Sequence, residues 1–142
     1  MKDSNQEITL DPIKNARRYV TNARDALRDH GKLNTDTGRY EDPKYVKAAG
    51  HYLWSGVLIA LDFVFHVKEE KKKQKRDSRV SVDDYIAVIA KRDYKLLGWV
   101  KDGYELLHLS MGYDGIQNKK VCENGFELAN SIIDRCEGMM GK

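Results

Sequence analysis

The sequence has few of the residues that cross-link or interrupt a fold. Only two cysteines and two prolines occur among its 142 residues. Two cysteines are too few for a disulfide framework, and on one continuous helix Cys122 and Cys136 would lie about 21 Å apart, far beyond disulfide reach. We therefore expect reduced, buried thiols, which suit a cytoplasmic location.

The sequence also lacks a long apolar run. The longest, over residues 52–67, is shorter than the roughly 20 residues that a bilayer requires, and it contains Asp62 and His66. The N-terminal segment has no apolar core of the kind found in secretion signals. We expect a buried helix of a bundle here and no membrane partner.

Familiar catalytic patterns are missing as well. The sequence contains no glycine-rich phosphate loop, no GxSxG, no HExxH and no cysteine pair with metal-ligand spacing. It also has no alternating apolar and polar stretch long enough to predict a strand. These absences disfavour several enzyme classes, and we expect neither a cofactor nor a metal.

The composition is typical of a single helical domain. Hydrophobic residues make up 41% and charged residues 33% of the chain, which is enough apolar material for a real core. We expect one domain over residues 1–142, with a flexible N-terminus (residues 1–10) and a frayed C-terminus (residues 138–142).

Both prolines follow an aspartate, an arrangement that predicts helix starts. In Asp11-Pro12 and Asp42-Pro43 the aspartate suits the N-cap, and proline at the first helical position loses no hydrogen bond. We predict helices over residues 12–30 and 43–73. Apolar residues recur every three or four positions in the first helix, at Ile13, Ala16, Val20, Ala23 and Leu27.

The rest of the chain predicts further helices. Ser81 and Asp84 form a capping-box pattern at the start of a helical stretch that continues toward a helix over residues 92–112, and a last helix is expected over 117–137. Gly50 and Gly56 lie inside the second helix and suggest close helix contact. The predicted fold is an all-α, antiparallel bundle of four to five helices.

The first two helices resemble a known family. "DPIKNARRYVTNARDALRDHG" followed by "YVKAAGHYLWSGVLIALDF" resembles the HEPN-like helical bundles, which include RNases and non-catalytic subunits that accompany nucleotidyltransferases. The resemblance implies that Arg24 contacts a phosphate and that His30 assists proton transfer, with Asp25 at the polar position that follows the arginine.

The spacing of Arg24 and His30 favours a different interpretation. Six steps of about 100° place them about 120° apart around one helix, with a rise of about 9 Å. In active members of the family the motif belongs to a later helix, whereas here it ends the first. We predict that His30 continues the apolar stripe and that Arg24 covers apolar surface with its stem.

The sequence therefore favours a non-enzymatic binding or interaction module that forms a homodimer through an apolar helix face. A protein partner, such as a nucleotidyltransferase, is a further expectation. The alternative is a HEPN-type RNase or nucleotide-binding subunit that uses Arg24 and His30.

Polar residues of the second helix form a candidate ligand site. His51, Ser55, Asp62 and His66 fall within an arc of about 60°. They form either a stripe that faces solvent or a polar groove in which Asp62 and His66 pair. Two such ligands are too few for a zinc site.

Residues 68–79 form a basic segment with seven basic and three acidic residues. Its candidates for binding an anionic partner are Lys71, Lys72, Lys73, Lys75 and Arg76. The segment lacks the aromatic residues that stack on bases, so a solvated helix end is favoured over a nucleic-acid site.

Overall fold

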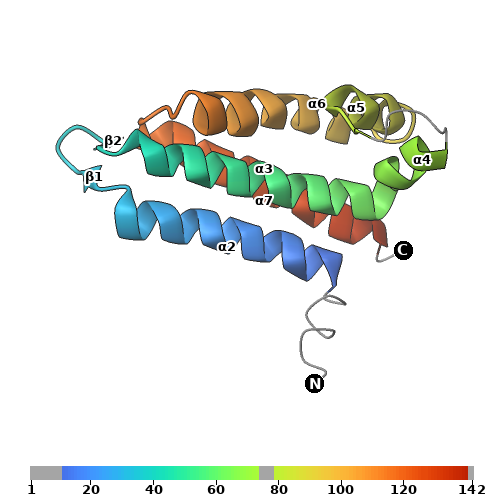
Figure 1. Cartoon of the computed structure of the whole chain (residues 1–142), viewed down its shortest axis with the longest axis horizontal. Helices are drawn as coiled ribbons and strands as arrows, with labels where there is room; N and C mark the ends of the chain where they lie inside the picture. Colours follow the sequence, from blue (N-terminus) through green and yellow to red (C-terminus); the bar gives the residue numbers. More distant parts are fainter. Residues whose placement is uncertain (1–10, 74–78, 141–142) are drawn as a thin grey trace, which may run out of the picture.

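The computed structural model of the chain describes residues 11–73 and 79–140. The predicted all-α class is confirmed, because most of the described chain is helical and its strands form one short hairpin (Figure 1). In chain order the elements are α2 (Pro12–His30), β1 (Leu33–Asn34), β2 (Arg39–Tyr40), α3 (Pro43–Phe65), α4 (Val67–Lys73), α5 (Val82–Ala90), α6 (Tyr94–Gly103), the π-helix η1 (Tyr104–Tyr113) and α7 (Lys119–Met140).

The two expected helix starts are present. The Asp11 carboxylate accepts a hydrogen bond from the Ile13 backbone N–H at 2.8 Å, and Asp42 accepts one from the Lys44 N–H at 3.1 Å. Each aspartate thereby satisfies one of the amide groups that have no partner inside the helix. The bounds of α2 agree with the predicted range.

The second helix is shorter than predicted. Instead of running to residue 73, α3 ends at Phe65, and His66 adopts a left-handed conformation with φ of 55° before α4 begins. Asp62 holds this corner, because its carbonyl accepts from the His66 N–H and its carboxylate accepts from the Lys68 N–H, each at 2.8 Å. The corner lets the chain turn while Val67 remains buried.

The predicted helix over 92–112 is also interrupted. It is not continuous with α5, since Asp93 starts a new helix by accepting a hydrogen bond from the Leu96 N–H at 3.1 Å. From Tyr104 onward the backbone widens into η1. The last helix starts at Lys119 and continues to Met140, so residues 138–140, predicted to fray, are helical. Residues 1–10 and 141–142 lie outside the described part.

A small hairpin lies in the loop where no strand was expected. Leu33 pairs with Tyr40 and Asn34 with Arg39 in antiparallel register. The Asn34 side chain closes the turn by accepting hydrogen bonds from two backbone N–H groups, at 2.9 and 3.2 Å. The hairpin places the Tyr40 ring against Gly31, where it closes the core at the end of α2.

Helix α3 is the central element of the bundle. It packs against α2, η1 and α7, while α7 also contacts α2 and α6 (Figure 1). Among the described residues, only α3 is long and apolar enough to cross a membrane, and 56% of its most apolar window is buried inside the fold. This degree of burial is typical of a core helix. The HEPN-like relationship of this bundle stays a prediction.

The glycines of α3 make the close contacts that the sequence suggested. A Cβ at Gly50 would overlap the backbone nitrogen of Gly112 and lie 2.7 Å from the Leu107 carbonyl oxygen. A Cβ at Gly56 would lie 2.8 Å from the Ala16 carbonyl oxygen. The backbones of α3, η1 and α2 therefore approach each other at positions where any side chain would collide with main-chain atoms.

We expect Gly50→Ala to lower the free energy of unfolding by about 3 kcal/mol, because two rigid backbones would have to separate. Gly98→Ala is the matched control, since a Cβ there meets nothing within 4 Å. This substitution should raise the free energy of unfolding by about 0.5–1 kcal/mol, because glycine is unfavourable inside a helix relative to alanine. Chemical denaturation of both variants measures the difference. Equal stability of the two variants would contradict the close approach.

Candidate functional site

Arg24 and His30, the two residues singled out by the resemblance to HEPN-like bundles, lie on different sides of α2. The Arg24 guanidinium lies over the Phe126 ring of α7, 4.1 Å from its centroid. The His30 ring stacks on Tyr45 of α3, with centroids 4.9 Å apart. The two side chains also border separate hollows of the surface. The guanidinium group of Arg24 therefore lies over an aromatic ring, whereas the prediction that its stem covers apolar surface stays a prediction.

The predicted place of His30 is wrong. His30 is exposed and does not continue the buried stripe, which ends at Leu27. At this end of α2 the buried ring of Tyr40 packs against Gly31. His30 instead stacks on the ring of Tyr45 of α3.

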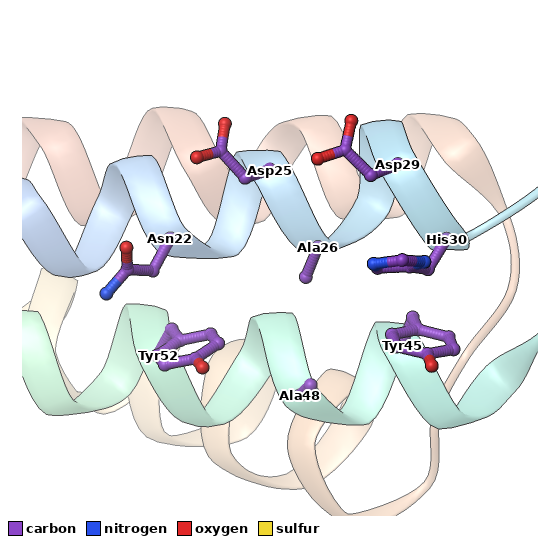
Figure 2. A pocket seen from close by; sticks show the side chains of 8 residues that line it. All are labelled: Asn22, Asp25, Ala26, Asp29, His30, Tyr45, Ala48 and Tyr52. Carbon is purple, nitrogen blue, oxygen red and sulfur yellow. The ribbon is translucent and has the colours of Figure 1, made fainter.

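Helices α2 and α3 enclose a shallow groove of about 380 Å³. We call it the α2–α3 groove; its lining residues are Asn22, Asp25, Ala26, Asp29, His30, Tyr45, Ala48 and Tyr52 (Figure 2). Rings of Tyr45 and Tyr52 rise from α3, and the His30 ring reaches over from α2. The two alanines keep the space between the rings open. Tyr52 is 37% exposed and also meets Tyr19 of α2 edge to face.

The acidic edge of the groove lies on α2. Asp25 and Asp29 project away from α3 along the outer side of the helix (Figure 2). Arg28 lies 3.0 Å from Asp25 and 2.9 Å from Asp29. The hydrogen bond from Arg28 lowers the pKa of Asp29, so this carboxylate is ionised at neutral pH. Both carboxylates remain about half exposed.

The polar residues of α3 are divided among different environments. His51 faces His108 of η1, with ring centroids 6.4 Å apart. Asp62 caps α4 through the Lys68 N–H, and His66 Nδ1 lies 3.7 Å from Glu69. Ser55 is half-buried between these two groups. Within the described residues, no hydrogen bond or ion pair joins the side chains of Asp62 and His66.

An aromatic cluster on η1 was not predicted from the sequence. His108 stacks on Tyr104 with centroids 5.2 Å apart, and it lies 6.1 Å from the Trp54 ring of α3. Its Nδ1 is buried and has no hydrogen-bond partner among the described residues. Tyr104 and His108 are four residues apart, but the contact with α3 depends on the π-helical backbone, which the sequence pattern did not reveal.

The basic segment is partly neutralised within the chain. Lys71 lies 3.2 Å from Asp84 and joins α4 to α5, and Lys73 lies 3.6 Å from Glu70. Lys72 is exposed. Lys75 and Arg76 lie outside the described residues. The corner between α5 and α6 adds Lys91 and Arg92 beside Lys71, a contribution that the local charge run did not indicate.

The cysteines and the acidic residues offer no metal centre in the part of the chain that the structure describes. No group of three or more histidine, cysteine, aspartate or glutamate side chains converges there. Cys122 and Cys136 are both free and buried. Burial raises the pKa of Cys122 to about 11 and that of Cys136 to about 12, so both are protonated thiols at neutral pH.

The fold and sequence place the chain in a family. Residues 11–138 match the family described as a domain of unknown function, DUF5618, and the chain belongs to that family. Its fold is similar to that of a solved protein of unknown function from Dyadobacter fermentans, with 40% identity and a TM-score of 0.78. The similarity covers 91% of this chain and 95% of that one. No curated protein matches the chain.

The separate partners of Asp62 and His66 lead to a prediction. Asp62→Ala should lower the free energy of unfolding by about 1 kcal/mol through loss of the α4 cap, and His66→Ala should cost little. Because the side chains do not meet, the two effects should add in the double variant within about 0.5 kcal/mol. Urea denaturation of the four proteins measures the coupling. A coupling above 1 kcal/mol would instead indicate a paired polar site.

Proposed function

We propose that this protein is a non-enzymatic interaction module that acts as a homodimer and uses the outer face of α2 and α3 as its binding surface. The proposal rests mainly on the α2–α3 groove, where tyrosine rings that lie between two helices remain accessible to solvent. Tyrosine supplies a large, rigid contact area and is enriched at protein interfaces.

The positions of Arg24 and His30 support binding over catalysis. General acid–base work by His30 requires hydrogen-bond reach to a phosphate that Arg24 holds. Arg24 instead lies over Phe126 on the α7 side, while His30 stacks on Tyr45 on the α3 side. A single phosphate between them would require both side chains to leave their aromatic partners.

The other parts of the proposal rest on the sequence. A cytoplasmic location agrees with the two protonated, buried thiols. We propose a protein partner such as a nucleotidyltransferase on the basis of the HEPN-like resemblance. Binding of nucleic acid by the basic segment is not favoured, because Lys71 and Lys73 already have acidic partners. We propose no membrane role, since α3 serves as a core helix.

The homodimer is tested by the mass of the protein in solution. Light scattering after size-exclusion chromatography should give twice the chain mass of 16.3 kDa at micromolar concentrations, with dissociation on dilution. A mass of one chain at every concentration up to a millimolar would contradict self-association.

The absence of catalysis is tested with RNA. We expect purified protein to leave single-stranded RNA and tRNA intact at the level of a buffer control, because Arg24 and His30 cannot act on one phosphate. The Arg24→Ala and His30→Ala variants should behave like the wild type. Cleavage that disappears in both variants, while both retain their helical circular dichroism, would establish the RNase alternative.

A further inference from the structure

Helix α2 carries a line of exposed polar residues on its outer side. We call it the α2 ridge; it consists of Lys14, Arg18, Asn22, Asp25 and Asp29, which follow each other at steps of four, four, three and four residues. This spacing places them on one side of a helix. All are exposed except Asp25, which is half-exposed. The ridge borders the α2–α3 groove, since Asn22, Asp25 and Asp29 belong to both (Figure 2).

The charges of the α2 ridge are separated by sign. The half near the start of the helix is basic, with Lys14 and Arg18, and the half near its end is acidic, with Asp25 and Asp29. This order is opposite to the one that the helix dipole favours, because basic groups lie near the positive end and acidic groups near the negative end. The arrangement therefore needs a reason outside the isolated helix.

The basic half has no partner in the described part of the chain. Ion pairs engage Arg17 with α7 and Arg28 with Asp25 and Asp29, but none involves Lys14 or Arg18. The pairs of Arg28 are exposed and contribute little to stability. A carboxylate has about four lone-pair sites, so Asp25 and Asp29 can each accept another cation.

The spacing is symmetric about one point of the helix. Lys14 and Asp29 are equidistant from the midpoint between Thr21 and Asn22, and so are Arg18 and Asp25. A second α2 placed antiparallel, with a two-fold axis at this midpoint, would set each basic residue opposite an acidic one along about 22 Å of helix. A two-fold interface repeats every contact, so four ion pairs would form.

We propose that a second copy of this chain docks on the α2 ridge in this antiparallel register, with Lys14 facing Asp29 and Arg18 facing Asp25 of the partner. This inference rests on the proposed homodimer, specifies its register, and places it on a charged face of α2 instead of the apolar helix face expected from the sequence. Antiparallel helices at 8–10 Å between axes bring the exposed ring of Tyr52 and the α2–α3 groove to the edge of the same interface. The tyrosines supply contact area, and the charges fix the register.

Charge reversal tests the register. The basic-half variant Lys14→Glu/Arg18→Glu and the acidic-half variant Asp25→Lys/Asp29→Lys each place like charges opposite each other. We expect dimerisation of either variant alone to weaken by about tenfold or more at low salt. An equimolar mixture of the two should form a heterodimer with wild-type affinity, because every reversed charge then faces its opposite.

Two controls make the result specific. Lys119→Glu/Lys120→Glu changes the net charge by the same amount on exposed residues of α7 and should leave the dimer intact. Asn22→Cys lies beside the proposed axis and should form a disulfide-linked dimer on mild oxidation, whereas Glu127→Cys on α7 should not. The cysteine pair keeps the proposal testable if a charge variant fails to fold.

The outcomes separate this inference from the proposed function. A monomeric wild type overturns both. A wild-type dimer that neither charge variant weakens, that the mixture does not restore, or that Asn22→Cys does not cross-link, overturns the α2 register and leaves the homodimer in place. Weakening by each variant together with restoration in the mixture establishes the register.

Discussion

The stability of the fold depends on shielding the apolar helix α3 from water. This helix is apolar around most of its circumference, and eleven of its residues are buried, so one neighbour cannot shield it from water. Helices α2, η1 and α7 surround it, and glycines allow two of them to come very close. At Gly56 the backbone of α2 approaches α3 closely, and at Gly50 the backbone of η1 does so. The side of α3 that remains partly open is the one that carries Tyr45 and Tyr52.

The neighbours of α3 shield it from water in different ways. Helix α2 is regular and presents a single buried stripe. The opposite side is built from α5, α6 and η1, which are joined by corners and a widened backbone. Asp93 links this side to α7 by holding Arg135 at 2.8 Å. Of these elements, η1 and α5 contact α3, while α6 packs against α5, η1 and α7.

The parts of the fold that could be predicted from the sequence depend on local interactions. Asp-Pro starts and the stripe of α2 involve neighbours within a turn or two, so their pattern is visible in the residues themselves. The ends of α3 and the nature of η1 depend on contacts between segments. The apolar residues of the second helix continue past His66 to Val67, and only the corner held by Asp62 shows that the backbone turns there.

The candidate site could be predicted less well for the same reason. The family resemblance singled out Arg24 and His30, and helix geometry placed them apart, but their aromatic partners Phe126 and Tyr45 come from other helices. The closeness of His51 and His108 was equally hidden. Tyr45 and Tyr52 are aromatic residues seven positions apart on one helix, a spacing that the sequence does show, but their groove exists only where α2 lies beside α3.

The π-helical backbone of η1 has a consequence for how the family can vary in length. Its hydrogen bonds close one residue later than those of an α-helix, so the segment holds more residues in each turn. Loss of a single residue within Tyr104–Tyr113 would either tighten the segment toward α-helical geometry or turn the later side chains by one residue step about the helix axis. In the second case a loss before Leu107 would move Leu107 and Met111 out of the core, where both are now fully buried. The core therefore constrains the number of residues in η1 as well as their identity, and α6 leads into η1 without a loop that could absorb a change.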